Sequence, residues 1–209
     1  MRVLIADDHA VVREGLKRVL AGLGEGLEVG EAANASEALK LARGARWDVL
    51  LLDIAMPGGN GLDLLKQLRR ERPALPVLIL SMYPEAQYAL RVLRAGAFGY
   101  LPKETATEQL LDAIRTVRRG ERFASPGVVS RMAAELGGNE GREPQETLSD
   151  REFEVLRLIA QGHGVTVIAG RLSLRVSTVG TYRARLLRKL GLQRTADLIA
   201  YAVREGIER

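Results

Sequence analysis

The sequence predicts an α/β domain with a doubly wound parallel sheet, followed by a small all-α domain. Four short runs of mostly branched aliphatic residues, at 3–6, 49–52, 77–80 and 98–101, are typical of parallel strands that are buried on both faces. Segments with helical spacing separate these runs, so strands and helices alternate along the first part of the chain. Beyond residue 148 only helical patterns remain, which predicts the second, all-α part.

Residues suited to phosphoryl transfer follow the four predicted strands. Asp7 and Asp8 follow the first strand, Asp53 the second, Ser81 the third, and Lys103 lies just beyond the fourth. Functional groups of a doubly wound sheet gather outside the carboxyl ends of its strands, so we expect these side chains to lie close together. Clustered carboxylates at such an edge can hold a divalent cation, and the neutralised aspartate can then accept a phosphoryl group.

The motifs around these residues resemble those of a bacterial response-regulator receiver domain. They are LIADDHA, LLDIAMPGGNG, LILSMYP and GYLPKE, and they stand in the family order and at the family spacing. The resemblance implies a flavodoxin-like receiver domain, residues 1–120, with a five-stranded parallel sheet. His9 follows the acid pair, and we expect it to lie near the site without a role in the chemistry.

The resemblance also implies a role for each site residue. Asp53 is the expected phosphoacceptor, and its donor would be a phosphohistidine in a sensor histidine kinase. An Mg²⁺ cofactor would be held by Asp7, Asp8, Asp53 and the backbone carbonyl of Ala55. Ser81 and Lys103 would contact the phosphoryl group, and Tyr100 would rotate when the Ser81 hydroxyl moves. These changes would favour a homodimer of the phosphorylated chain.

Length and composition fit two domains in a reducing compartment. The chain has 209 residues, of which 46% are hydrophobic, and this suffices for two cores. It contains no cysteine, which excludes disulfides and thiolate metal sites, and its two histidines cannot make a histidine zinc site alone. No apolar stretch approaches about 20 residues, and the N-terminus enters a predicted strand without a signal region. We therefore expect a cytoplasmic protein without membrane contact.

The net charge of +5 is concentrated in the C-terminal part. Residues 1–147 carry 20 basic and 20 acidic side chains, whereas residues 148–209 carry 11 basic and 6 acidic ones. Between residues 171 and 194 there are seven basic residues and no acidic residue. Such a surplus indicates a polyanionic partner.

A connecting segment at 121–147 separates the two predicted domains. Residues 125–136 begin with a serine and a proline, which favours a helix that starts there. Residues 137–147, GGNEGREPQET, have no aliphatic side chain, so we expect a flexible linker.

The C-terminal domain, residues 148–209, is expected to contain four helices. The first would be capped by Ser149 with Glu152 completing a capping box, and the last would be capped by Thr195. Two short helices between them, the second with basic side chains, predict a helix-turn-helix. The strings LSDREFEVLRLIAQG, TVGTYRARLLRKLGL and TADLIAYA resemble the LuxR-type helix-turn-helix module. A receiver followed by this module is typical of the NarL/FixJ family, which implies a DNA-binding transcription factor activated by phosphorylation.

The resemblance implies that residues 176–190 lie in the major groove of double-stranded promoter DNA. Ser177, Thr178, Thr181 and Arg183 would lie nearest the base edges, and Tyr182, Arg185, Arg188 and Lys189 nearest the phosphates. Leu186, Leu187 and Leu190 would face the core of the domain.

The middle of this module departs from the family pattern. Gly170 stands where the family commonly has a glutamate, and Gly180 stands on the recognition face at a position that is frequently polar or basic. Arg175 replaces the serine that often caps the recognition helix, which leaves Ser173 or Ser177 as the expected cap. The base sequence that this helix reads therefore stays open.

Several alternatives stay open. Asp7 and Asp8 could merely cap a helix, and the arginines at 183–188 could form a solvated helix face. A phosphatase of the haloacid dehalogenase type would need a second aspartate two residues after its nucleophile, where Ala55 stands. A quorum-sensing receptor would need an aromatic-lined pocket, which one Trp and three Phe make poor. The last alternative is a DNA-binding regulator that works without phosphorylation and uses its receiver only for dimerisation.

Overall fold

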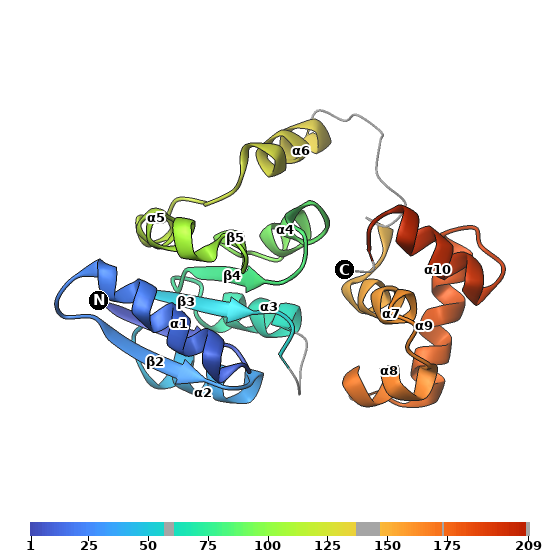
Figure 1. Cartoon of the computed structure of the whole chain (residues 1–209), viewed down its shortest axis with the longest axis horizontal. Coiled ribbons are helices and arrows are strands. Elements are labelled where there is room, and N and C mark those ends of the chain that lie inside the picture. The colour runs from blue at the N-terminus through green and yellow to red at the C-terminus, as the bar shows by residue number, and fades with distance from the viewer. Residues whose placement is uncertain (57–60, 137–146, 173, 208–209) are drawn as a thin grey trace. The chain divides into compact units, whose positions relative to one another are not determined.

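The computed structural model of the chain describes residues 1–56, 61–136, 147–172 and 174–207, apart from the side chains at 86–87 and 134–136 (Figure 1). Contacts divide the chain into two compact units, residues 1–132 and 133–209. Each unit is described by itself. The predicted linker at 137–147 lies, except for Thr147, outside the described residues.

The first unit is built on the parallel sheet that the sequence predicts. Its strands are β1 (Arg2–Ala6), β2 (Glu28–Ala32), β3 (Val49–Asp53), β4 (Val77–Ser81) and β5 (Gly99–Pro102). All neighbours pair in parallel, in the order β2-β1-β3-β4-β5. The order reverses between β1 and β3, which is where a doubly wound sheet forms its site. The five-stranded doubly wound fold is therefore confirmed.

Strand β2 is the one strand that no apolar run indicated. Its sequence, EVGEA, pairs only with β1 and lies at the edge of the sheet. Because an edge strand is partly exposed, its outward positions can carry glutamates in place of aliphatic residues. Gly30 in its centre lies under the ring of Trp47, where a Cβ atom would come 2.3 Å from the ring atom Cη2.

Helices cover both faces of the sheet (Figure 1). On one face, α1 (Ala10–Leu20) continues into a short 3-10 turn, η1 (Ala21–Leu23), and packs against α5 (Ala106–Arg118). On the other face, α2 (Ala35–Gly44) packs against α3 (Gly61–Glu71), and α4 (Glu85–Arg94) contacts β5. Successive residues of the central strands point to opposite faces of the sheet. Leu50 and Leu51 are both fully buried because helices cover each face.

The helix predicted from the serine and proline at 125–126 is present. Helix α6 spans Pro126–Leu136, and the backbone N–H of Val129 donates to the carbonyl of Ser125. Upstream of it, Gly120 ends α5 with a φ of 81°, a left-handed conformation that glycine adopts without strain.

The second unit contains the four predicted helices. They are α7 (Asp150–Ala160), α8 (Val165–Leu172), α9 (Val176–Lys189) and α10 (Thr195–Arg204). Phe153, Leu156, Ile168, Val179, Leu186 and Leu198 form the buried interior. Of the three leucines predicted to face inward on α9, Leu186 is fully buried, while Leu187 and Leu190 are half-buried.

The helix caps differ in part from the prediction. Ser149 caps α7, and with Glu152 it forms the expected capping box. Thr195, in contrast, is the first residue of α10, and Arg194 occupies the N-cap position. The prediction was wrong because the Asp197 carboxylate accepts from the Arg194 backbone N–H at 2.9 Å, which satisfies this helix start without a hydroxyl cap.

Helix α9 begins without a side-chain cap. Arg175 is its N-cap residue in an extended conformation, and its side chain makes no capping hydrogen bond. Ser177 lies inside the helix, so it does not take over the capping role, and Ser173 lies outside the described residues.

No described helix of either unit is long and apolar enough to span a bilayer.

Candidate functional site

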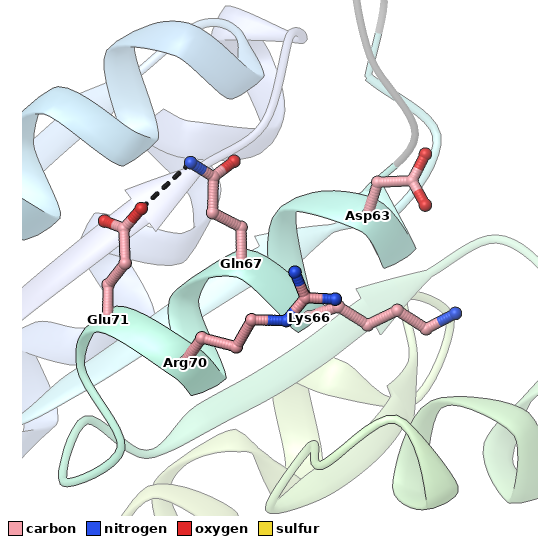
Figure 2. Close-up of a pocket in the computed structure, with 5 residues that line it drawn as sticks. All are labelled: Asp63, Lys66, Gln67, Arg70 and Glu71. Carbon is pink, nitrogen blue, oxygen red and sulfur yellow. Dashed lines mark hydrogen bonds between the residues drawn. The ribbon is translucent and has the colours of Figure 1, made fainter.

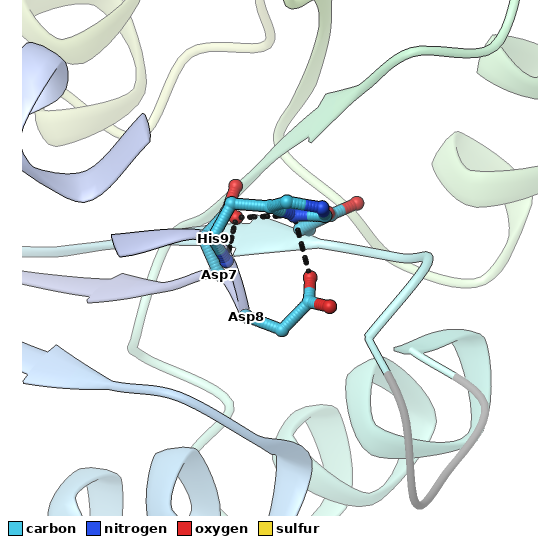
Figure 3. Close-up of side chains that lie close together, drawn as sticks. Asp7, Asp8 and His9 are labelled. Atoms are coloured by element: carbon cyan, nitrogen blue, oxygen red, sulfur yellow. Dashed lines mark hydrogen bonds and ion pairs between the residues drawn. The ribbon is translucent and has the colours of Figure 1, made fainter. Parts of the chain in front are cut away.

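The carboxyl ends of β1 and β3 bring the predicted acidic residues together. Asp7 follows β1 directly and Asp53 is the last residue of β3, and their side chains are only 1% and 2% exposed. Oxygen atoms of Asp7, Asp8 and Asp53, together with a nitrogen of His9, all lie within 4.8 Å of one another. Figure 3 shows three of these side chains at the strand end. The convergence predicted from strand order is therefore present.

Lys103 joins the two most deeply buried carboxylates. It follows β5, and its Nζ lies 2.6 Å from Asp53 Oδ2 and 2.6 Å from Asp7 Oδ2. The lysine side chain is only 10% exposed. Burial lowers the pKa of Lys103, but the two carboxylates outweigh this effect and leave the pKa above its ordinary value. Lys103 therefore stays a cation between two anions.

Asp53 is a buried carboxylate with contacts to both of its oxygens. Its Oδ1 accepts a hydrogen bond from the backbone N–H of Ala55 at 2.9 Å, while Oδ2 faces Lys103. Burial raises the pKa of Asp53 above its ordinary value, because it outweighs the opposite effects of Lys103 and of the Ala55 N–H. The charged Asp53 carboxylate therefore destabilises the fold, and a cation that neutralises its charge reduces this destabilisation.

Ser81 and Tyr100 lie on the neighbouring strands β4 and β5. Ser81 is fully buried at the end of β4, and its Oγ accepts from the backbone N–H of Tyr83 at 3.1 Å. Tyr100 is 1% exposed, and its hydroxyl donates to the carbonyl of Tyr83 at 2.5 Å. Burial raises the pKa of the Tyr100 phenol. Both side chains thus engage the same residue of the loop that follows β4.

His9 takes part in the cluster more closely than we expected from the sequence. Its Nδ1 lies 2.9 Å from Asp8 Oδ1 and 3.4 Å from Asp7 Oδ1, although the imidazole is 67% exposed (Figure 3). The backbone N–H of His9 also donates to Asp7 Oδ1 at 2.9 Å. In the sequence, only the position of His9 next to the acid pair could have indicated these contacts.

The donor set fits a hard divalent cation. Two buried carboxylate oxygens, Asp7 Oδ2 and Asp8 Oδ1, each have one neighbour at ion-pair distance, Lys103 and His9 respectively. Clustered carboxylate oxygens with unused acceptor capacity are what Mg²⁺ binds. The acidic cluster predicted from the sequence is therefore present.

Two hollows on the first unit lie away from this cluster. One of about 420 Å³ is lined by Asp63, Lys66, Gln67, Arg70 and Glu71, all from α3 (Figure 2). Arg43 binds Glu71 through two nitrogens at 2.6 and 2.7 Å, which lowers the pKa of that carboxyl to about 2. A second hollow, of about 380 Å³, lies beside α5. Neither contains a residue of the predicted site.

In the second unit, α9 carries the residues predicted to contact DNA. Ser177, Thr181, Arg183, Arg185 and Arg188 are exposed, Thr178 and Tyr182 are half-buried, and Lys189 has one-third of its side chain exposed. None of the three arginines has an acidic partner among the residues that the structure describes. Lys189 differs, because its Nζ lies 2.6 Å from the Glu152 carboxylate. The exposed cations leave α9 with positive charge that suits a polyanion.

Comparison with known families identifies both units. Residues 3–115 match the family described as response regulator receiver domain. Residues 146–202 match the family described as bacterial regulatory proteins, luxR family. The receiver family thus covers the acidic cluster, and the luxR family covers α7, α8 and α9.

Two relatives match along their whole length. The response regulator GacA of Pseudomonas aeruginosa is 37% identical over 209 residues, which cover 99% of this chain and 97% of GacA. The oxygen regulatory protein NreC of Staphylococcus carnosus is 37% identical over 214 residues, with 99% of both chains covered.

Solved structures of response regulators are similar as well. RcsB of Salmonella enterica serovar Typhimurium, bound to the promoter rprA in the presence of the phosphomimetic BeF₃⁻, is 30% identical with a TM-score of 0.69. The match covers 96% of this chain and 97% of that one. The response regulator ChrA of a haem-sensing two-component system is 31% identical with a TM-score of 0.51, and 99% and 98% are covered.

These matches decide among the function classes. The family consists of DNA-binding transcription regulators and not of enzymes, which removes the phosphatase alternative. The N-terminal receiver family also differs from the ligand-binding domain that a quorum-sensing receptor would need. With a receiver domain, a LuxR-type helix-turn-helix and full-length relatives, the chain belongs to the NarL/FixJ family of two-component response regulators.

Proposed function

We propose that a sensor histidine kinase transfers a phosphoryl group to Asp53 and that this transfer controls promoter binding. The observation that carries the proposal is the placement of Asp53 between Lys103 and two further carboxylates at one sheet edge. A buried carboxylate whose pKa is raised by burial gains most from the cations that gather around it. Promoter DNA as a partner implies that the protein works in the cytoplasm of a bacterium.

The transfer is a substitution at phosphorus. Asp53 Oδ attacks the phosphorus of a phosphohistidine on the kinase, a P–O bond forms, and the P–N bond breaks. The imidazole leaves with the bonding electron pair and takes up a proton. Lys103, which is already 2.6 Å from Asp53 Oδ2, would then pair with a phosphoryl oxygen of the product.

Mg²⁺ is the cofactor that the oxygen cluster supports. Asp7, Asp8, Asp53 and the backbone carbonyl of Ala55 would hold it. When bound, the ion would supply positive charge that offsets the charge of the transferred group. His9 would contribute by keeping the Asp8 carboxylate oriented, since its Nδ1 is already 2.9 Å from Asp8 Oδ1.

The new charge would be sensed by Ser81 and Tyr100. An aspartyl phosphate carries about −1.5 to −2 charges and three acceptor oxygens, to which the Ser81 hydroxyl can donate. That hydroxyl now accepts from the Tyr83 N–H, and Tyr100 binds the Tyr83 carbonyl, so a shift of Ser81 would act on the same loop. Such a local change biases two pre-existing conformations of the receiver.

The phosphorylated chain would bind DNA as a homodimer. RcsB, to which this chain is similar, has been solved as dimers bound to DNA. On α10, the exposed residues Ala196, Ile199, Ala200 and Val203 recur at the spacing of one helix face. An apolar face without charge is complementary to itself, which supports contact between two copies of the DNA-binding unit. The contact would place two α9 helices on two half-sites.

Intact mass and size measurements test the phosphorylation step. The wild-type chain and Asp53→Asn are incubated with acetyl phosphate and Mg²⁺, and each is weighed by mass spectrometry and sized by chromatography. We expect a phosphoryl mass gain and a shift to dimer for the wild type only. Equal mass gain in Asp53→Asn would move the phosphoacceptor elsewhere. A wild type that gains no mass but binds DNA tightly would favour the regulator that works without phosphorylation.

A further inference from the structure

Lys189 is the last residue of α9, and its side chain reaches the start of α7. Its Nζ donates to Glu152 Oε2 at 2.6 Å and to the backbone carbonyl of Thr147 at 3.2 Å. Glu152 lies 37 positions earlier in the chain, so the pair is a long-range contact. We name these three groups, the Lys189 ammonium, the Glu152 carboxylate and the Thr147 carbonyl, the Lys189 clamp.

The acidic partner in the clamp is buried and fully engaged. The Glu152 residue is only 3% exposed, and its Oε2 also accepts the backbone N–H of Ser149 at 2.8 Å. Burial acts to raise the pKa of Glu152, but Lys189 and Ser149 outweigh it and hold the pKa below its usual range. Removing one member of a buried ion pair leaves the other charge unpaired, which is costly. The clamp is therefore not an incidental surface pair.

Lys189 stands apart from the other cations of α9. Arg183, Arg185 and Arg188 are exposed and have no acidic partner among the described residues, so their charges can pair with phosphate. The Lys189 ammonium already has a carboxylate and a carbonyl as acceptors. To bind a phosphate it would have to leave the buried Glu152 carboxylate without its cation.

We infer that Lys189 is a positioning residue, which fixes the C-terminal end of the recognition helix on α7, and not a phosphate contact. This inference rests on the proposed role of α9 as the helix that reads DNA. The clamp ties the end of α9 to the capping box at the start of α7 and to Thr147. The helix would then present Arg183, Arg185 and Arg188 at a fixed angle to the groove. An error in that angle displaces all of them together.

The effect of Glu152→Gln on DNA affinity separates a positioning role of the clamp from a purely electrostatic one. Glu152→Gln removes a negative charge from a DNA-binding unit, and charge alone then predicts tighter binding to a polyanion. Loss of the clamp predicts weaker binding, because the recognition helix is held less firmly. We expect roughly tenfold weaker binding, within the range of effects that residues without ligand contact produce.

The experiment measures DNA affinity of the full chain against salt concentration. The probe is a duplex of about 30 base pairs, selected by the phosphorylated wild type from a random pool. Glu152→Gln and Lys189→Met should both weaken binding while the slope of log affinity against log salt stays that of the wild type. Arg188→Ala, as the matched control, should reduce this slope by about 0.9, the value for one phosphate contact. Tighter or unchanged binding by Glu152→Gln would overturn the inference, and so would a slope reduced by Lys189→Met.

A labelling experiment on the wild type covers the case in which a variant does not fold. Acetylation of lysines is followed by mass spectrometry, with the exposed Lys40 as reference. In the chain without DNA, Lys189 should react several-fold more slowly than Lys40, and DNA should add no further protection. Fast reaction that DNA suppresses would overturn the inference. If the wild type binds no duplex while Lys189 still reacts slowly, the proposed role of α9 fails and the clamp itself stands.

Discussion

Lys103 Nζ lies 2.6 Å from Asp53 Oδ2, and this pair sits where β3 and β5 end at the same edge of the sheet. The same nitrogen contacts Asp7 Oδ2 at 2.6 Å. One lysine therefore neutralises part of a buried cluster of acids before any phosphoryl group arrives. Lys103 thus offsets part of the cost of burying the Asp53 charge and keeps a cation next to the proposed phosphoacceptor.

Replacing Lys103 should destabilise the receiver and make it depend on magnesium. In Lys103→Met, Asp7 and Asp53 would face each other without a cation, at a cost of about 3 kcal/mol in the free energy of unfolding. Added Mg²⁺ should recover more stability in this variant than in the wild type, because it supplies the missing charge. Denaturant unfolding with and without Mg²⁺ measures both effects. Lys40→Met, at an exposed site, is the control and should stay within about 0.5 kcal/mol of the wild type.

Asp53→Asn should stabilise the chain at neutral pH. The folded-state pKa of Asp53 is raised, so the charged carboxylate disfavours the fold above that pKa, and this penalty disappears as the pH falls towards the unfolded value of 3.8. We expect a gain on the order of 1 kcal/mol at pH 7, which narrows steadily towards pH 4.5. Unfolding of both proteins across this range measures the difference. A gain that widens as the pH falls would contradict a raised pKa.

Replacing Gly180 and Gly30 by alanine should change stability in opposite directions. A Cβ atom at Gly180, inside α9, would meet nothing within 4 Å, so Gly180→Ala should stabilise the chain by about 1 kcal/mol through helix propensity. At Gly30 the Cβ would come 2.3 Å from Trp47 Cη2, so Gly30→Ala should destabilise it by roughly 1–3 kcal/mol. Thermal unfolding measures both. A loss of stability in Gly180→Ala would contradict the open space around Gly180.

Arg188→Ala should weaken DNA binding most at low salt and reduce the slope of log affinity against log salt. Arg188 is exposed on α9 without an acidic partner among the described residues, and one phosphate contact contributes a salt slope of about 0.9. The loss should be similar for specific and for random duplexes, because phosphates carry no sequence. Arg115→Ala is the control, since Arg115 lies on the receiver and pairs with Asp112. An unchanged slope would remove Arg188 from the contacts.

The strand ends could be predicted from the sequence because each buried strand is marked by its own residues. Val49 to Leu52 and Val77 to Leu80 are uninterrupted apolar runs, and the parallel topology then brings Asp53 and Ser81 to one edge. Strand β2 carried no such mark, since an edge strand is only partly buried and Gly30 is required by the ring of Trp47, 17 residues away. The residue types at such positions depend on packing against segments that are distant in the sequence, and a local pattern does not show that packing.

The same limit applies to the charged residues. Arg188 and Lys189 are adjacent and looked equivalent as phosphate contacts, yet only Lys189 meets the buried Glu152. Likewise, the sequence placed His9 beside the acids without showing that its Nδ1 lies 2.9 Å from Asp8. In both cases the partner is determined by tertiary structure.

The most direct measurement is the DNA affinity of the wild type and of Asp53→Asn, each with and without acetyl phosphate and Mg²⁺. We predict that treatment strengthens binding of the wild type to a selected duplex by at least about tenfold and leaves Asp53→Asn unchanged. Equal affinity of treated and untreated wild type, with the mass gain confirmed in the same sample, would contradict control of DNA binding by the phosphoryl group.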